Sequence, residues 1–139
     1  MQAHNISRLV KSEDLNHHGT LFAGRMAEWF IEGGFITAAS ILGKPDSLVC
    51  KKLHGLTFNE PINKGEIINI ETKLVLTGTT SLKVYVKVTK VNDTKCVVDG
   101  FITFVCVDEN GNKRPHNLSQ PEATTDEEKS LISRAKNER

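Results

Sequence analysis

A polar loop that leads into a long apolar segment carries the residues best suited to chemistry. The loop covers residues 16–24 (NHHGTLFAG), and only Arg25, Glu28 and Glu32 interrupt the apolar segment that follows. At about 3.6 residues per helical turn, these three charges fall on a stripe about 60° wide. A helix that is apolar nearly all round is buried, and a carboxylate at its boundary needs partners because desolvating a charge is costly. The pattern therefore indicates an active site rather than a solvated surface.

The start of such a helix suits the polarisation of a carbonyl group. Its first N–H groups have no internal partner and lie at the positive end of the helix dipole, so they can stabilise an oxyanion. Gly24 stands there without a side chain, which lets a substrate approach closely. A partly buried carboxylate is also a stronger base than one in water. Glu28 and Glu32 stand at i and i+4, so their mutual repulsion would raise the pKa of one of them in the same way.

Composition excludes several classes of function. The chain has 139 residues, enough for one domain with a core. With 18 Lys and Arg against 17 Asp and Glu, the formal net charge is +1, which predicts no nucleic-acid or membrane partner. No apolar run could span a bilayer, and the first residues lack the apolar part of a signal peptide, so we expect the cytoplasm. Three cysteines without CxxC spacing suit reduced thiols there and predict no metal site.

Hydrophobic periodicity predicts one long helix among strands. Alternation of apolar and polar residues is the period of a half-buried strand, whereas a more continuous apolar run at 96–107 is typical of a central strand covered on both faces. Gly43 and Pro45 end the helix. The predicted order is a strand at 6–13, a helix at 21–42, and strands at 48–58, 66–76, 82–89 and 96–107, with turns at 77–80, 92–94 and 108–111.

This order predicts an α+β architecture in residues 1–120, with an antiparallel sheet wrapped around one long central helix. Edge strands and one flank of the helix stay uncovered, so we expect a homodimer to complete the fold.

A charged helical tail follows at residues 121–139. Thr124 or Thr125 can cap a helix whose first turn is acidic. Basic residues end it, which matches the helix dipole; they are Arg134, Lys136 and Arg139. Because its apolar residues are few, we expect this helix to pack lightly or fray; they are Leu131, Ile132 and Ala135.

Four segments, in order along the chain, match a known family. They are residues 16–24 leading into 27–29, residues 54–58 with Pro61 and Gly65, residues 78–81, and residues 104–111. Together they span about residues 6–116 and resemble the hotdog-fold acyl-CoA thioesterases of the acyl-CoA hydrolase type. The resemblance implies a hotdog fold and hydrolysis of an acyl-CoA thioester to free acid and CoA, without a metal or organic cofactor.

The resemblance also implies roles for individual residues. Asn16 lies near the thioester, a backbone N–H around Gly24 polarises its carbonyl, and a helix carboxylate activates water or attacks directly. The site is shared across a dimer, and dimers often associate into tetramers or hexamers. Counted without gaps from Asn16, the family's acid falls on Ile31. We predict that Glu32 serves from the neighbouring position; the alternatives are that Glu28 takes over or that the site has lost its acid.

Further residues are candidate substrate contacts. The family implies that Thr79, Thr80 and Ser81 contact the pantetheine arm or the thioester of CoA, and the alternative is a polar hairpin turn. His17 either lines the thioester or has a structural role. The alternative function for the whole chain is a non-catalytic hotdog module that binds acyl-CoA or a protein partner, which the substitution at Ile31 makes credible.

Each of the remaining candidate residues also has a purely structural interpretation. Lys51, Lys52 and Arg114 could meet the CoA phosphates, which favour basic partners, or could simply be solvated. Asn16 favours turns and caps. Cys50 is expected to be a small buried residue, since nothing in the sequence supplies the activating neighbour that a nucleophilic thiol needs.

Overall fold

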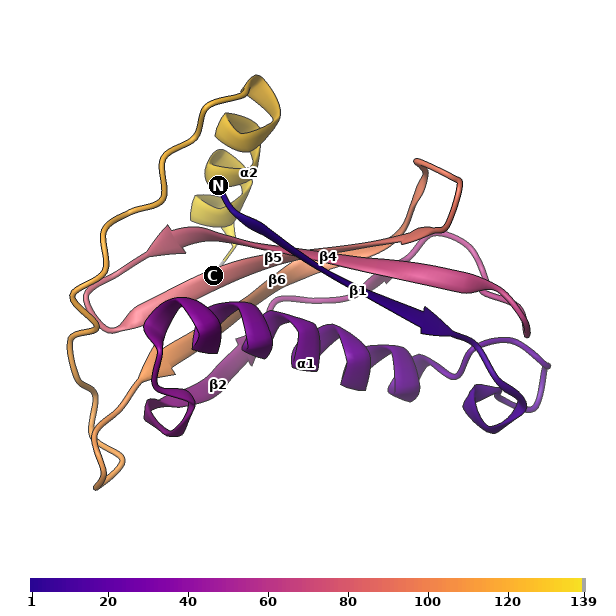
Figure 1. Ribbon diagram of the computed structural model, residues 1–139, viewed down its shortest axis with the longest axis horizontal. Coiled ribbons are helices and arrows are strands. Elements are labelled where there is room, and N and C mark those ends of the chain that lie inside the picture. Colours follow the sequence, from indigo (N-terminus) through magenta and orange to yellow (C-terminus); the bar gives the residue numbers. More distant parts are fainter. Residues whose placement is uncertain (139) are drawn as a thin grey trace.

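The chain folds as one antiparallel sheet with a helix on each face (Figure 1). The computed structural model describes residues 1–138. The strand order is β1-β4-β5-β6-β2, and a short β3 also pairs with β6. The elements are β1 (Ala3–Leu9), η1 (Ser12–Asp14), α1 (Ala23–Leu42), η2 (Pro45–Ser47), β2 (Leu48–Leu53), β3 (Thr57–Phe58), β4 (Ile67–Thr77), β5 (Ser81–Lys90), β6 (Cys96–Cys106) and α2 (Asp126–Asn137). The predicted α+β class is confirmed.

Helix α1 lies against one face of the sheet and forms the centre of the core. It follows Phe22, which is extended, and ends at Gly43, whose φ of 78° is the left-handed conformation that favours glycine. Gly33 and Gly34 let the helix approach the sheet closely, since a Cβ on Gly34 would lie 2.8 Å from Ile102 Cδ1. The predicted helix and its end are confirmed, and its start lies two residues later than expected.

Strand periodicity decides which side chains meet α1. On β5, Leu82, Val84, Val86 and Val88 are fully buried against the helix, as their alternation with polar residues predicts. On β6, consecutive residues are buried on opposite faces of the sheet. Ile102 and Phe104 belong to the core around α1, whereas Phe101 belongs to a second cluster under α2. The prediction that this strand is central and covered on both faces is confirmed.

The strand predicted at 48–58 is two strands, β2 and β3, and this is a correction. Gly55 has a φ of 89°, so the extended chain cannot continue through it. Gly55 also lies close to β6: a Cβ on Gly100 would lie 2.6 Å from the Gly55 carbonyl oxygen. A bulge between Cys50 and Lys52 further shifts the register of β2 against β6. These features turn the chain between the two short strands.

Helix α2 packs on the sheet face opposite α1, so the expectation that it packs lightly or frays is wrong. Leu131 and Ala135 are buried with Val75, Tyr85 and Phe101 of the outward sheet face. The helix is capped at the predicted place: the Thr125 hydroxyl accepts a hydrogen bond from the Glu128 N–H at 3.1 Å. The expected basic residue Arg139 lies outside the described residues.

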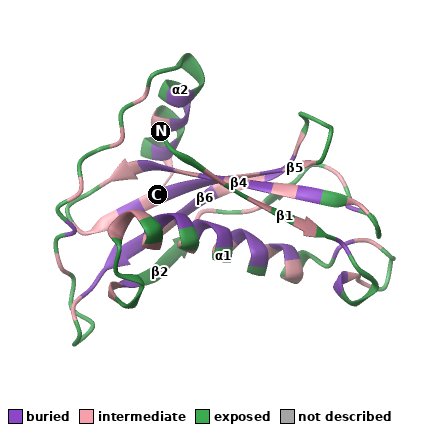
Figure 2. Cartoon of the chain, in the orientation of Figure 1, coloured by how far each residue is buried: buried purple, intermediate pink, exposed green. Residues whose placement is uncertain are grey.

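One side of α1 stays uncovered in the single chain, as Figure 2 shows along the helix. Ile36 on this side is 38% exposed. Phe22, directly before the helix, is 55% exposed. Large apolar side chains left in water at one surface mark a region where another surface can bind.

Candidate active site

The uncovered side of α1 carries a hollow of about 770 Å³, which we call the α1 hollow. Its floor is apolar and its rim is charged. The charged stripe predicted on the helix forms part of that rim. The lining residues are Arg8, Arg25, Glu28, Trp29, Ile31, Glu32, Phe35, Cys50 and Phe104. The structure therefore brings both candidate glutamates and Ile31 to one surface, beside aromatic and aliphatic side chains.

Both glutamates at the rim have a cationic partner, as predicted. Glu32 Oε1 accepts a hydrogen bond from Arg8 Nη2 at 2.6 Å, and Glu28 Oε2 accepts one from Arg25 Nη1 at 3.2 Å. The Glu32 side chain is nevertheless 56% exposed and the Glu28 side chain 67% exposed. Within one chain, ion pairing rather than burial therefore sets the environment of these carboxylates.

Asp14 is a buried carboxylate beside this site that the sequence reasoning missed. Its Oδ1 lies 3.3 Å from Arg25 Nε, and its Oδ2 accepts a hydrogen bond from the Lys11 N–H at 2.9 Å. Its carbonyl oxygen accepts a hydrogen bond from the Phe22 N–H at 2.8 Å. Asp14 thus joins the segment before the loop to the start of α1. The only indication of this role in the sequence is that Asp14 lies two residues before the polar loop 16–24.

Cys50 also lines the α1 hollow, and the expectation that it is buried is wrong. It pairs in register with Phe104 on the α1 side of the sheet, but β2 is an edge strand, so nothing in the single chain covers it. Partial burial still raises the pKa of the Cys50 thiol. A thiol with a raised pKa is mostly protonated at neutral pH, which argues against a nucleophilic role.

The side chain of Asn16 is engaged within its own loop. Its Oδ1 accepts hydrogen bonds from the N–H groups of His18 at 2.8 Å and Thr20 at 3.2 Å, and its Nδ2 donates to Thr20 Oγ1 at 3.0 Å. This is the arrangement of a turn residue. His17 is exposed, with its ring 3.9 Å from that of His18. Neither Asn16 nor His17 lines the α1 hollow of the same chain.

Gly24 is the second residue of α1 and is exposed. Phe22, at the N-cap, has no side-chain group that could accept a hydrogen bond from the first N–H groups of the helix. A Cβ on Gly24 would lie 2.5 Å from a ring carbon of Phe22, so this ring packs where a side chain would otherwise stand. The Phe22 ring therefore lies beside the helix start where the resemblance places the oxyanion site.

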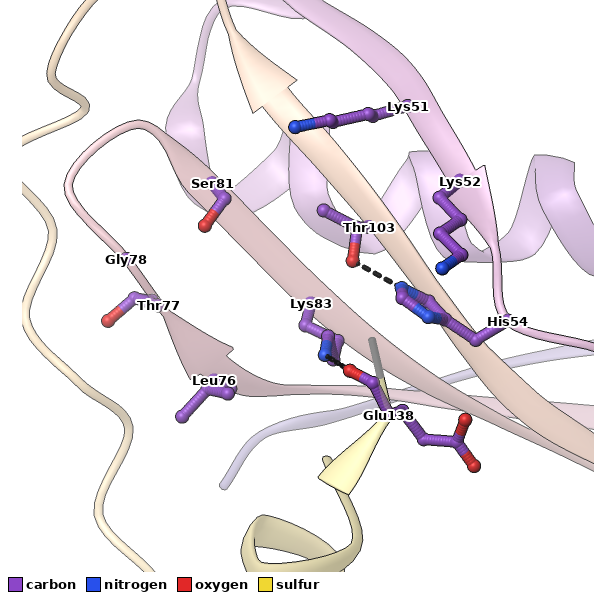
Figure 3. Close-up of a pocket in the computed structure, with 10 residues that line it drawn as sticks. All are labelled: Lys51, Lys52, His54, Leu76, Thr77, Gly78, Ser81, Lys83, Thr103 and Glu138. Carbon is purple, nitrogen blue, oxygen red and sulfur yellow. Dashed lines mark hydrogen bonds between the residues drawn. The ribbon is translucent and has the colours of Figure 1, made fainter. Parts of the chain in front are cut away.

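A second hollow, of about 510 Å³, lies on the opposite face of the sheet, and we call it the outer hollow (Figure 3). It crosses the ends of β2, β6, β5 and β4 beside the C-terminal end of α2. The lining residues are Lys51, Lys52, His54, Leu76, Thr77, Gly78, Ser81, Lys83, Thr103 and Glu138. Two groups that the sequence treated separately, the β2 lysines and part of the 77–81 turn, therefore meet here.

The bulge in β2 explains why both lysines reach the outer hollow. Residues directly opposite in an antiparallel pair lie on the same face. Cys50 pairs with Phe104, which faces α1, whereas Lys52 pairs with Thr103, which faces outward. Lys51 is the extra residue of the bulge and lines the outer hollow as well.

Lys83 and His54 complete the polar lining of the outer hollow. The Lys83 ammonium donates hydrogen bonds to the carbonyl oxygens of Ala135, at 2.8 Å, and of Glu138. Burial lowers its pKa, and the neighbouring Lys52 acts in the same direction. His54 Nε2 lies 2.6 Å from Thr103 Oγ1; Figure 3 marks this hydrogen bond with a dashed line.

The other predicted contacts lie outside this hollow. The carbonyl oxygens of Thr79 and Thr80 accept hydrogen bonds from the N–H groups of His116 at 3.2 Å and Cys106 at 2.7 Å, which fix the turn. Arg114 donates to Ser47 Oγ at 3.2 Å and lines a separate hollow. Within the described chain, no group of three or more His, Cys, Asp or Glu side chains could hold a metal ion. No helix in residues 1–138 has the length and apolar character to span a membrane.

Comparison with known proteins decides the family. Residues 18–97 match the sequence profile of the thioesterase superfamily. YkhA of Bacillus subtilis, named as an uncharacterized acyl-CoA thioester hydrolase, is 30% identical over 131 residues, covering 88% of this chain and 74% of its own. The chain belongs to the thioesterase superfamily. The resemblance to hotdog-fold acyl-CoA thioesterases is thereby confirmed.

Solved structures of similar proteins confirm the fold of this thioesterase. An apo-hexameric acyl-CoA thioesterase superposes with a TM-score of 0.87 at 30% identity, over 98% of this chain and 87% of that chain. An acyl-CoA hydrolase of Staphylococcus aureus, solved with butyryl-CoA, CoA and CoA disulfide, gives 0.86 at 25% identity over 98% and 80%. Variants of that hydrolase with an aspartate, a threonine or an asparagine replaced by alanine are also among the similar structures.

Proposed function

We propose that this thioesterase hydrolyses acyl-CoA thioesters to a free acid and CoA at the α1 hollow. The observation that carries the proposal is the composition of this hollow. Glu28 and Glu32 stand at its rim, directly beside Trp29, Phe35 and the aliphatic Ile31. A carboxylate next to an apolar surface suits a substrate that has a reactive polar ester at one end and a hydrocarbon chain beyond it.

Glu32 is the proposed base or nucleophile. As a base it takes a proton from water while the water oxygen attacks the thioester carbonyl carbon. The carbon–sulfur bond then breaks, and the CoA sulfur leaves with a proton returned from the carboxyl group. As a nucleophile its oxygen attacks the carbonyl carbon, the carbon–sulfur bond breaks, and CoA thiolate leaves behind an acyl anhydride. Water then hydrolyses the anhydride to the free acid and the Glu32 carboxylate, and the released proton goes to the thiolate. The N–H groups at the start of α1, around Gly24, stabilise the oxyanion in either route, so the reaction requires no metal or organic cofactor.

The geometry of α1 favours a site that is completed by a second chain. Gly24 and Glu32 are eight residues apart, and at about 1.5 Å rise per residue they are separated by about 12 Å along the helix. One thioester carbonyl cannot contact both. A second copy with its helix antiparallel brings the start of one helix to the glutamate of the other. The exposed Ile36 on this side supports a dimer of this kind.

We also propose this dimer as the unit of larger assemblies, since similar thioesterases, including one from Yersinia pestis, are hexameric. Asn16 and His17, which line neither the α1 hollow nor the outer hollow, are proposed to act across such an interface. Cytoplasmic location is likewise a proposal, supported by three cysteines that form no disulfide.

The outer hollow is the proposed site for the phosphates of CoA. Lys51, Lys52 and Lys83 surround it, and the hydroxyl of Ser81 adds a donor. Ammonium and hydroxyl donors suit phosphate oxygens. In this proposal the 77–81 turn contributes through Ser81, and the exposed Thr79 and the neighbouring Thr80 contact the pantetheine arm from the tip of the turn.

The test is steady-state release of CoA thiol from acyl-CoAs of increasing chain length. We expect turnover by the wild-type protein and a loss of roughly 100-fold in kcat for Glu32→Gln, as for removal of a general base. Glu28→Gln is the matched control on the same stripe, with an expected change below about threefold. Equal losses for both variants would refute the assignment of Glu32.

The second candidate function is a module that binds acyl-CoA without hydrolysing it. Ile31, at the position where the resemblance expects an acid, favours this reading. The same assay separates the two candidates when it is paired with thermal unfolding in the presence of CoA. Stabilisation by CoA without turnover of any acyl-CoA would establish the binding module and exclude the enzyme.

A further inference from the structure

We propose that Arg8 is a positioning residue that holds the Glu32 carboxylate at the rim of the α1 hollow. This inference rests on the proposed function, in which Glu32 is the reacting carboxylate. Arg8 lies in β1, 24 residues before Glu32. The two side chains meet because Arg8 leaves the edge strand β1 on the face of the sheet that α1 covers.

The fold fixes the direction of Arg8. In the pairing of β1 with β4, Arg8 stands directly opposite Ile68. Ile68 is fully buried in the core around α1. Since directly opposite residues of an antiparallel pair share a face, the Arg8 side chain leaves β1 toward α1. Its register in the sheet therefore aims Arg8 at the helix.

Two contacts hold the guanidinium in place. Its central carbon lies 5.3 Å from the ring centroid of Trp29, a cation–π contact with a side chain that is itself 8% exposed. Its Nη2 donates to Glu32 Oε1 at 2.6 Å. Its Nε is buried and has no hydrogen-bond partner within residues 1–138. The cation–π contact and the bond to Glu32, and not the Nε–H, hold the guanidinium at the rim of the hollow.

The bond to Arg8 restrains a side chain that is otherwise free to move. More than half of the Glu32 side chain is in solvent, and a glutamate there has several open rotamers. A catalytic carboxylate must be held close to its productive geometry. The bond occupies Oε1 alone, so Oε2 remains available for a water molecule or a carbonyl carbon.

Arg25 does not serve Glu28 in the same way. Arg25 Nε lies 3.3 Å from Oδ1 of the buried Asp14, while its Nη1 binds Glu28 at 3.2 Å. Arg25 is thus shared between two acids, whereas Glu32 is the acid partner of Arg8. The glutamate with a dedicated cation is Glu32.

The position of Arg8 explains how an acid can serve at position 32 when the resemblance expects it at position 31. Moving an acid from position 31 to 32 rotates it by about 100° around the helix. Ile31 and Glu32 both line the α1 hollow, and Arg8 reaches the hollow from the adjacent β1. A cation on that side can hold a carboxylate that has moved by one residue.

The experiment is a double-mutant cycle on Arg8 and Glu32, with kcat and KM measured for one acyl-CoA that the wild-type protein turns over. We expect Arg8→Gln to lower kcat by about tenfold while KM changes less than twofold. In the Glu32→Gln background, Arg8→Gln is expected to change the remaining rate less than twofold, because its partner is absent. Arg8→Lys, which keeps the charge, is expected to recover most of the loss.

Arg134 provides a matched control on the other face of the sheet. It also binds an acid, Asp99 at 3.0 Å, and lies 5.4 Å from the ring centroid of Tyr85. Arg134→Gln therefore removes the same two kinds of contact far from the α1 hollow. We expect it to leave kcat within twofold of the wild-type value, while its unfolding temperature shifts as much as that of Arg8→Gln.

The outcomes that overturn the inference are distinct from failure of the proposed function. An equal loss on Arg8→Gln in the wild-type and Glu32→Gln backgrounds would mean that Arg8 acts independently of Glu32, and the inference would fall while the enzyme stands. A kcat of Arg8→Lys as low as that of Arg8→Gln would also overturn the inference and leave the enzyme standing. This comparison replaces the double-mutant cycle if Glu32→Gln leaves no measurable rate. Absence of turnover by the wild-type protein would overturn both.

Discussion

Replacing Leu131 by alanine tests whether α2 is an integral part of the fold. The Leu131 side chain is 5% exposed and packs against Val75, Tyr85 and Phe101. Truncating a buried leucine costs about 2–5 kcal/mol, and we expect the lower end, about 2–3 kcal/mol, because one side of this cluster is only a surface helix. At about 3 °C per kcal/mol for a chain of 139 residues, the unfolding temperature should fall by roughly 6–9 °C.

The loss of stability in Leu131→Ala has an upper limit. It cannot exceed the free energy that docks α2, because beyond that point the helix separates from the sheet by local unfolding. Hydrogen exchange of α2 amides should then accelerate in Leu131→Ala while the amides of β5 and β6 keep their protection. The kcat for acyl-CoA should stay within twofold, since the α1 hollow lies on the opposite face of the sheet.

Ile132→Ala is the matched control. Ile132 follows Leu131 on the same helix but is only partly buried and lies outside the cluster under α2. Its truncation should cost less than about 1 kcal/mol, as for an apolar side chain that is mostly at the surface. Thermal unfolding and hydrogen exchange of the two variants are measured together. Equal effects of the two truncations, or no effect of Leu131→Ala, would refute the docking of α2 on this face.

Three further predictions concern the loop, the outer hollow and acid stability. Replacing Lys51 and Lys52 together by glutamine should raise KM for acyl-CoA by about tenfold with kcat unchanged. The KM of the wild-type protein should also rise with salt concentration, because salt screens contacts between lysines and phosphates. A lower kcat at constant KM in the double variant would contradict this prediction. Asn16→Ala should lower kcat more than it weakens CoA binding measured by calorimetry, and equal losses would reduce Asn16 to a loop-shaping residue. Hydrogen bonds from the N–H and hydroxyl of Thr124 lower the pKa of Glu128 to about 2, so its stabilising contribution, complete above the ordinary carboxyl range, is lost as pH falls from about 4.5 toward 2. Glu128→Gln should remove this part of the acid dependence in unfolding curves, and an unchanged profile would assign acid unfolding to other groups.

Local patterns in the sequence were sufficient for α1 and for most of the sheet. The apolar positions of β5 alternate with polar ones, so Leu82 to Val88 could only be buried on one face. Gly43 follows the last helical residue and takes the left-handed conformation that ends a helix. The charged stripe of α1 was also predicted correctly, because the helical period alone places Arg25, Glu28 and Glu32 together.

Features that depend on residues far apart in the chain were missed or wrong. The break between β2 and β3 depends on the close approach of Gly55 to Gly100, 45 residues later. The docking of α2 depends on Tyr85 and Phe101. The alternation of their strands predicts that both side chains face outward, but it does not predict that a helix covers them. No pattern among neighbouring residues predicts either of these long-range contacts.

The sequence by itself determined most of the elements, the thioesterase family and the chemical character of the helix stripe, because each depends on neighbours within a few residues or on segments that recur in relatives. Only the tertiary structure decided which cation meets which acid. The pairing of β1 with β4 brings Arg8 to Glu32, and the bulge in β2 sends Cys50 to one hollow and Lys52 to the other. Strand register sets these contacts, and register follows from the packing of the whole sheet on α1.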